Sequence, residues 1–244
     1  MKSPKASSLS AAALICLGAC VQTPAPVAEP SPSPVCPNHS AVVSDEGLWS
    51  KDRLAADVDA DGRDDDIALA VDESGPQGCQ VFVVVRTSAA VAAVGIDQAG
   101  MTVLRAAGIP RLAQAADIDN RSGAEVVVDL IAGASTVHAA IFSMGSGVLE
   151  RLLIEGDGPE TADLFPYGGS VGHIEASDCA GVGQIVVSRA VPRGRNSYLV
   201  TRRFYRTEGS SAEPSGEEQH GVAAGQIDKF PEYRTSPFGS CPLN

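Results

Sequence analysis

Short runs of β-branched and other apolar residues, separated by Gly, Pro and Ser, recur along the chain. Runs of this length and composition are typical of β-strands, and the clearest lie at residues 79–86, 137–143, 148–154 and 198–206. Residues 144–147, Met-Gly-Ser-Gly, predict a hairpin turn. No stretch has an apolar period of 3.6 residues, and only the alanine-rich residues 89–93 are compatible with a helix. The pattern therefore predicts an all-β domain.

A loop followed by an apolar run occurs three times. Residues 54–59, Leu-Ala-Ala-Asp-Val-Asp, recur as residues 114–119, Gln-Ala-Ala-Asp-Ile-Asp, and a fainter copy spans residues 172–188 with a longer loop through Cys179. Ile109-Pro110 and Phe165-Pro166 precede the second and third loops at the same spacing. About four strands per copy would make each copy one small antiparallel sheet, that is, a propeller blade.

The number of blades stays open. Only three copies are visible, whereas propellers usually have at least four blades. Either residues 41–49 and 222–241 combine into a degenerate fourth blade, or three sheets close in a smaller arrangement.

The first loop has the spacing that a cation of calcium size requires. It carries carboxylates at positions 1, 3, 5 and 9, namely Asp57, Asp59, Asp61 and Asp65. Gly62 at position 6 permits the tight turn, and Arg63 at position 7 would offer its backbone carbonyl. Position 12 is Ala68 and not the Glu of an EF-hand, so the loop closes at position 9 onto a strand. The alternative is a solvated acidic turn, in which the carboxylates would repel one another.

This loop resembles the calcium loop of the FG-GAP repeat, also called the VCBS or integrin α-subunit-like repeat. The resemblance covers roughly residues 45–200 and is strongest at the first loop. It implies a β-propeller-like fold of three to four antiparallel blades with bound Ca²⁺.

The second and third loops depart from the pattern. In the second, Asp117 and Asp119 keep positions 1 and 3 and Glu125 takes position 9, but Arg121 stands at position 5. A guanidinium there can pair with one of the two aspartates and replace the metal, so calcium at this loop is the weaker prediction. The third loop has His173 and Glu175 in place of the acids, and we expect no metal there; its cysteine suggests that a disulfide holds the loop instead.

The first 35 residues predict export and anchoring. Residues 1–19 have a basic start, a short apolar core and small residues before Cys20, as in a signal peptide. Leu17-Gly-Ala-Cys20 resembles the lipobox of bacterial lipoproteins, which implies lipidation of Cys20; the alternative is an ordinary secretory signal. Residues 20–35 are a Pro-rich tether, and residues 36–244 form the folded domain.

Charge and cysteines fit an exported protein. The formal net charge is −12, which argues against nucleic acid as a partner and against electrostatic adhesion to anionic lipid. Four cysteines in the domain predict two disulfides. We favour Cys36–Cys79 with Cys179–Cys241, and the rival pairing joins Cys36 to Cys241.

Two functions follow from these features. The first is a non-catalytic, calcium-binding surface lipoprotein, lipid-anchored on the extracytoplasmic face of the bacterial envelope, whose partner is an envelope protein or a glycan. The second is an extracytoplasmic hydrolase with its site in a propeller channel. Residues 168–172 match the nucleophile motif G-x-S-x-G around Ser170, but that motif requires a strand before it and a helix after it. A pocket lined by Ser170, His173 and Glu175 would favour the hydrolase.

Overall fold

The computed structural model describes residues 39–76, 79–96, 108–155, 164–170, 172–234 and 237–242. All of them belong to the unit Cys36–Asn244. The predicted signal peptide, the lipidation site Cys20, the tether and Cys36 lie outside the described residues. Among the described residues, no helix has the length and apolarity needed to cross a membrane.

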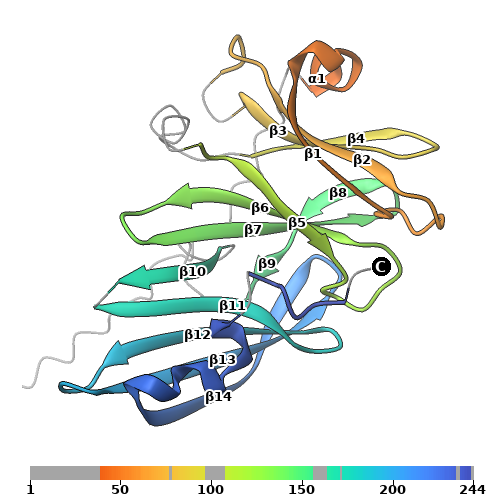
Figure 1. Ribbon diagram of the computed structural model, residues 1–244. Coiled ribbons are helices and arrows are strands. Elements are labelled where there is room, and N and C mark those ends of the chain that lie inside the picture. Colours follow the sequence, from red (N-terminus) through yellow and green to blue (C-terminus); the bar gives the residue numbers. More distant parts are fainter. Residues whose placement is uncertain are drawn as a thin grey trace, which may run out of the picture. The chain divides into compact units, whose positions relative to one another are not determined.

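The first part of the chain forms a four-stranded antiparallel sheet, sheet A, whose strands follow one another in chain order (Figure 1). The chain enters it through α1 (His39–Ser44) and η1 (Glu46–Leu48). The strands are β1 (Trp49–Ala56), β2 (Asp65–Val71), β3 (Val81–Arg86) and β4 (Val91–Gly95). This meander is the unit predicted for one repeat.

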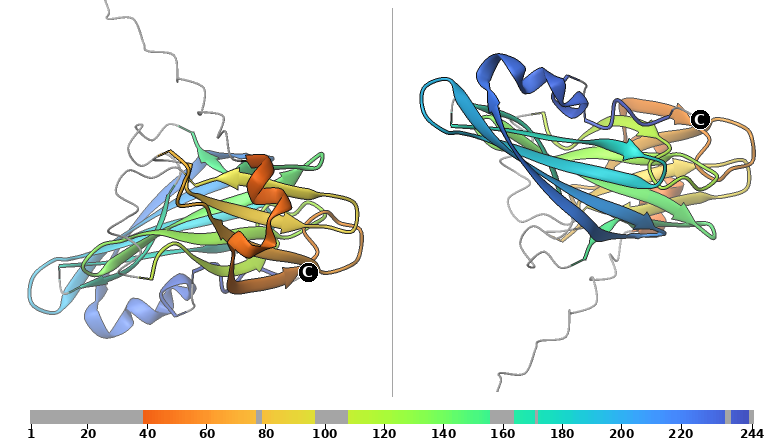
Figure 2. Two further views of the ribbon diagram at one scale, coloured as in Figure 1. Left: turned by 90° about the horizontal axis from the view of Figure 1, so that it is seen from above. Right: turned by 90° about the horizontal axis from the view of Figure 1, so that it is seen from below.

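The rest of the chain forms a ten-stranded sheet, sheet B, with the order β5-β6-β7-β10-β11-β12-β13-β14-β9 and with β8 beside β7. Neighbouring strands are antiparallel except for β9 and β14. The strands are β5 (Arg111–Ala116), β6 (Glu125–Ala132), β7 (Thr136–Gly145), β8 (Val148–Arg151), β9 (Leu153–Ile154), β10 (Phe165–Ser170), β11 (His173–Gly181), β12 (Gln184–Pro192), β13 (Ser197–Glu208) and β14 (Ser211–Ala223). Two short helical segments, η2 (Ala224–Lys229) and η3 (Pro231–Tyr233), follow β14 and contact β11, β13 and β14 (Figure 2).

The main core lies between the two sheets. Alternate residues of β2 and β3, such as Ile67 and Val83, pack in one buried cluster with Val126 and Phe142 of β6 and β7. The opposite face of sheet A buries a second cluster around Phe82, together with residues of α1 and β1. Because β2 and β3 are buried on both faces, they read in the sequence as continuous apolar runs and not as alternating ones. Each large side chain buried in this way contributes about 1.5–3 kcal/mol.

The prediction of an antiparallel, all-β architecture is confirmed. The prediction of separate blades is not confirmed. Only the first predicted repeat forms a sheet of its own, and the strands of the second and third continue as one sheet. The reason is the length of β7, whose second edge pairs with β10 near its start and with β8 near its end. The described residues show no ring of blades, and residues 41–49 and 222–241 contribute helices, turns and strand ends instead of a fourth blade.

Several local predictions can be compared directly. The hairpin turn is confirmed, with Ser146 and Gly147 both at positive φ between β7 and β8. Residues 89–93 form a turn and the start of β4, so the helix considered there is wrong. The third repeat has no loop of the predicted kind, because His173–Gly181 is the strand β11 and a tight turn at Val182 and Gly183 leads to β12.

The predicted disulfide Cys179–Cys241 is confirmed. It ties β11 to the C-terminal segment, where the ring of Phe238 packs edge-on against that of Phe165 at 5.5 Å between centroids. Because its cysteines are 62 positions apart in the sequence, loop closure contributes about 4 kcal/mol. Cys79 is also disulfide-bonded. Cys36, its predicted partner, lies outside the described residues.

Candidate metal centre

The first acidic loop connects β1 to β2 and gathers three carboxylates. Side-chain oxygens of Asp57, Asp59 and Asp61 all lie within 4.8 Å of one another. The pair Ala56–Asp65 of the β1–β2 ladder closes the base of the loop. Local sequence is sufficient for this geometry, because alternate residues turn their side chains inward around a sharp reversal.

Backbone amides support the three carboxylates. Ala60 and Gly62 have φ values of 65° and 83°, which reverse the chain direction. The amide of Asp61 donates to Oδ1 of Asp57 and to Oδ1 of Asp59, both at 3.1 Å, and the amide of Gly62 donates to Oδ2 of Asp57 at 2.9 Å. These donors offset part of the repulsion between the carboxylates and hold the loop in shape.

A hydroxyl from the β3–β4 turn also reaches the cluster. Ser88 Oγ donates to Oδ2 of Asp61 at 2.6 Å. The side chain of Asp61 is therefore fixed from outside its own loop, which sequence spacing alone did not indicate.

Asp65 also supports the loop backbone, and its predicted ligation of a metal stays a prediction. Its side chain is 3% exposed and is not one of the three gathered carboxylates. Oδ2 of Asp65 accepts hydrogen bonds from the amides of Val58 at 2.9 Å and Asp59 at 3.3 Å. Burial raises the pKa of Asp65, and the nearby charges of Asp59 and Asp61 act in the same direction. The position-9 carboxylate therefore fastens the loop backbone. The contribution of the Arg63 carbonyl to a metal stays a prediction.

The second loop repeats this construction between β5 and β6. Side-chain oxygens of Asp117, Asp119 and Glu125 lie within 4.8 Å of one another, and the pair Ala116–Glu125 closes the loop base. Oε2 of Glu125 accepts from the amides of Ile118 at 2.6 Å and Asp119 at 3.2 Å, as Asp65 does in the first loop. The two loop hairpins therefore share the same pattern of backbone hydrogen bonds.

Arg121 pairs with one of the two aspartates, as predicted. Its Nε lies 3.8 Å from Oδ2 of Asp119, but the guanidinium is 58% exposed and such a contact contributes little. The carboxyl groups of the second loop are more buried. Burial raises the pKa of Glu125 to about 8 and also raises the pKa of Asp119. Since the contact with exposed Arg121 is weak, it offsets little of the effect of burial on these carboxyl groups.

The two loops touch. The amide of Ala124 donates to the backbone carbonyl of Asp57 at 2.7 Å. Gly123 has φ 104°, and a Cβ there would lie 2.4 Å from the carbonyl oxygen of Val58. The glycine at position 7 of the second loop is the sequence signal for this close approach, which the spacing of the acidic residues does not indicate.

A polar cleft of about 320 Å³ opens beside the second loop. Asp119 and Glu125 line it together with two further acids, Glu150 and Glu208. Arg121 lines the same cleft, so acidic side chains outnumber basic ones beside the second loop.

The residues considered for hydrolysis do not form a site together. Ser170 ends β10 in a hairpin with β11, its Oγ accepting from the amide of Gly172 at 3.3 Å, so no strand-to-helix elbow is present. His173 Nε2 lies 3.0 Å from Thr136 Oγ1. Only Glu175 lines a sizeable cleft, about 440 Å³ in volume, and its companion there is His138.

Sequence reasoning also missed a buried polar group in sheet B. Asp129 is fully buried, and its Oδ2 accepts hydrogen bonds from Arg111 Nε and from the Tyr167 hydroxyl, both at 2.7 Å. Burial and the contact with Asp129 raise the pKa of Tyr167 to about 12. The group joins β5, β6 and β10, and the isolated acid in an apolar run of β6 was its only sequence signal.

No protein-family model, curated protein or solved structure matches this chain, so the resemblance to FG-GAP repeats rests on the loops themselves.

Proposed function

We propose that this protein is a calcium-binding surface module of the bacterial cell envelope that acts by binding and not by catalysis. The observation that carries the calcium site is the convergence of Asp57, Asp59 and Asp61 within 4.8 Å on a loop whose own amides support them. Ca²⁺ takes six to eight oxygen ligands, so these carboxylates would be completed by backbone carbonyls such as that of Arg63 and by water. The second loop is a weaker site of the same kind.

The proposed relation to FG-GAP repeats is limited to the loop hairpin. Each acidic loop lies between two antiparallel strands, at Ala56–Asp65 in one case and Ala116–Glu125 in the other. We propose that these hairpins are FG-GAP-like units in a two-sheet arrangement. A hydrolase with its site in a propeller channel has less support, because the described strands form no such channel and Ser170 and His173 lie outside the main cleft.

Calcium in the first loop would stabilise more than that loop. Asp57 offers its carboxylate to the cluster and its carbonyl to Ala124 of the second loop. Fixing Asp57 therefore also fixes the contact between sheet A and sheet B at this point.

The calcium site is tested by calorimetric titration and thermal unfolding of chelator-treated protein. We expect one site with a dissociation constant of about 10⁻⁴–10⁻³ M, the range of extracellular calcium modules. At 100 times that constant, calcium would stabilise the fold by about 2.7 kcal/mol. Asp59→Asn should abolish most of the gain. Asp64→Asn is the matched control, because Asp64 is an exposed acid of the same loop outside the cluster. A wild-type midpoint that ignores millimolar calcium, with no heat of binding, would refute the site.

The proposed location rests on residues 1–35, with Cys20 as the lipid anchor to the membrane. Cys20→Ser should release the protein into the medium or leave an unprocessed precursor. Unchanged membrane fractionation with normal processing would contradict the anchor. The anchored domain would bind an envelope protein or a glycan, and capture from envelope extracts with calcium or with chelator would identify which.

A further inference from the structure

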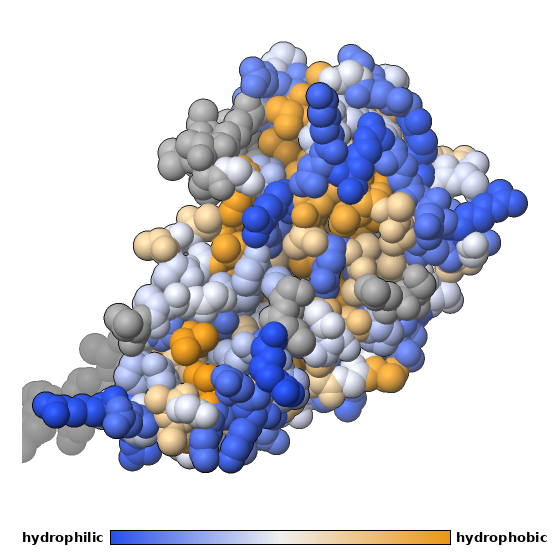
Figure 3. All heavy atoms as spheres, viewed as in Figure 1, coloured by the Kyte–Doolittle hydropathy of each residue, from blue (hydrophilic) through white to orange (hydrophobic). Residues whose placement is uncertain are grey.

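A cleft of about 440 Å³ lies on one face of sheet B, and no residue of either acidic loop lines it. It crosses β7, β11, β12 and β13 and has a volume typical of small-molecule sites. Hydrophobic side chains elsewhere on the face shown in Figure 3 form separate patches broken by hydrophilic ones. Large exposed hydrophobics among the described residues are only Val148, Leu153 and Val182. The cleft is therefore the stronger candidate for a binding site.

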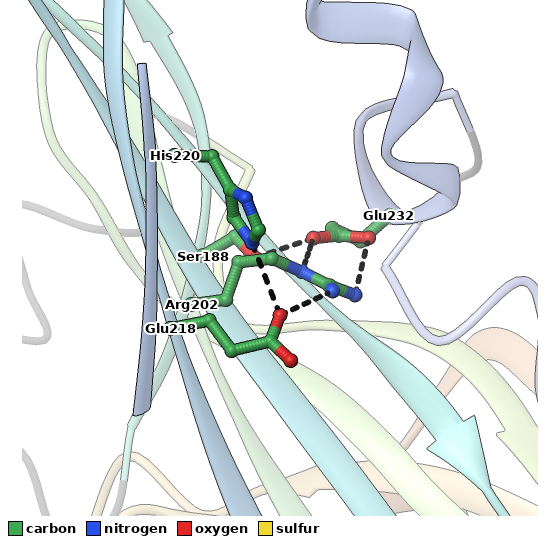
Figure 4. Close-up of polar contacts among 5 residues, drawn as sticks. All are labelled: Ser188, Arg202, Glu218, His220 and Glu232. Carbon is green, nitrogen blue, oxygen red and sulfur yellow. Dashed lines mark hydrogen bonds and ion pairs between the residues drawn. The ribbon is translucent and has the colours of Figure 1, made fainter. Parts of the chain in front are cut away.

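Strand alternation divides the basic residues of β13 between two environments. Arg202 points to the face covered by η2 and η3, where its Nε lies 2.8 Å from Oε1 of Glu232 and its Nη1 lies 3.1 Å from Oε2 of Glu218 (Figure 4). Its guanidinium is thus neutralised. Arg203 lines the cleft on the other face and is joined there by Arg189 of β12.

Two arginines are the strongest hydrogen-bond donors of the cleft. Arg189 and Arg203 each have more than half of the side chain exposed. Glu175, opposite Arg189 in the ladder, is the one carboxylate of the cleft and lies 3.6 Å from the Arg189 guanidinium. Arg203 pairs with Glu217 through its Nε at 3.2 Å, so each guanidinium already has one carboxylate partner. An anion in the cleft would bind through the remaining N–H donors of the two groups, since a guanidinium offers five.

The other walls are apolar or neutral. Ile154, Leu164, Pro166 and Val187 line the cleft beside the guanidinium groups. His138, also in the wall, has a buried Nδ1 with no partner among the described residues, and burial lowers its pKa. An apolar wall next to two guanidinium groups suits a ligand with a carbon skeleton and one acidic end.

We infer that the cleft binds a small amphiphilic organic acid, with the carboxylate at Arg189 and Arg203 and the carbon chain against Ile154, Leu164 and Val187. Arginine is suited to this role because its planar fork offers two parallel donors to a carboxylate. Glu175 limits the affinity, since it engages Arg189 and repels the ligand.

The test is calorimetric titration of the soluble domain with hexanoate and with hexanamide, its uncharged counterpart. We expect saturable binding of one hexanoate per chain, about tenfold tighter than hexanamide. Arg203→Gln should weaken hexanoate about tenfold, whereas Glu175→Gln should tighten it several-fold. Arg206→Gln is the control, because it removes the same charge from the same strand outside the cleft and should leave binding unchanged.

Two further titrations test the role of the apolar wall and the independence of the cleft from the calcium site. Glucuronate, an acidic sugar without an apolar chain, should bind more weakly than hexanoate, and equal affinity would overturn the role of the apolar wall. Asp59→Asn should leave hexanoate binding intact, which keeps this inference separate from the calcium site. Absence of saturable hexanoate binding up to about 10 mM, or an Arg203→Gln variant that binds like wild type, would overturn the site.

Discussion

Glu125 provides the sharpest quantitative prediction from the structure. Its side chain is 5% exposed and lies beside Asp117 and Asp119. Burial raises its pKa to about 8 from an ordinary value of 4.5, although the amides of Ile118 and Asp119 donate to it and partly oppose the shift. Between pH 4.5 and pH 8, with chelator present, Glu125 is therefore protonated in the folded state and ionised in the unfolded state.

The sign of the effect follows from this difference in bound protons. The unfolded state binds fewer protons than the folded state between pH 4.5 and 8, so the free energy of unfolding falls as pH rises through that window. Each pH unit changes the free energy of unfolding by about 1.36 kcal/mol per proton, so this free energy falls by about 3–5 kcal/mol across the window. The raised pKa values of Asp119 and Asp65 act in the same direction.

Glu125→Gln removes the titrating group and keeps an oxygen that can accept from the two amides. We expect the variant to lose most of the pH dependence and to exceed wild type in stability at about pH 8.5 in chelator. Glu150→Gln is the matched control, since Glu150 is an exposed glutamate that lines the same acidic cleft. The measurement is urea unfolding from about pH 5 to pH 8.5 with chelator present.

Two results would refute the reasoning. Wild-type protein that becomes more stable as pH rises in chelator would show that Glu125 is not held as the neutral acid. A Glu125→Gln variant whose unfolding free energy changes with pH as in wild type would place the titration at another group.

Calcium at the second loop would favour the ionised carboxylate, so added calcium should reduce the wild-type pH dependence and release protons on binding.

Two pairs of substitutions test the packing of the loops and of sheet B. Gly123→Ala should lower the free energy of unfolding by about 2–3 kcal/mol, because its Cβ would meet the carbonyl oxygen of Val58. Gly62→Ala is the control: Gly62 has positive φ but no atom within 4 Å of the added Cβ, so the loss should be only about 1 kcal/mol. Equal losses in chemical denaturation would contradict the loop contact. Asp129→Ala should cost about 1–3 kcal/mol, because the buried carboxylate accepts hydrogen bonds from the Tyr167 hydroxyl and from Arg111, whose side chain is 56% exposed. Arg111→Ala should add little in that background, and fully additive losses would argue against their coupling.

The parts of the fold that rest on local chemistry were predictable. The Ser146-Gly147 turn follows from residues that tolerate positive φ, and the spacing of aspartates around Gly62 follows from the loop that it closes. Spacing places Asp65 beside the cluster but does not show that its Oδ2 accepts backbone hydrogen bonds. These contacts depend on the burial of Asp65 beneath the loop, which is a tertiary property.

The arrangement of the strands was not predictable from local pattern. Nothing in residues 136–145 shows that one edge of β7 serves both β8 and β10, and this pairing decides between separate blades and one sheet. The strand β11 was misread as a loop because polar residues occupy its middle. Ser177 and Asp178 are buried there with partners, as when Oδ1 of Asp178 accepts from the amide of Ser240 at 2.9 Å.

Position 2 of each loop helps to hold the acidic cluster together. Val58 is buried in the core between the sheets, and Ile118 is buried in the core on the other face of sheet B. Separating the carboxylates would expose these side chains, at about 1.5–3 kcal/mol each, whereas two carboxylates about 4 Å apart near water repel by about 1–4 kcal/mol. In the more exposed first loop, the burial of Val58 and the repulsion between the carboxylates are comparable in size. The backbone amides that donate to Asp57 and Asp59 further stabilise the formed loop. In the second loop, burial and the nearby charges of Asp119 and Asp117 raise the pKa of Glu125, which favours its neutral form.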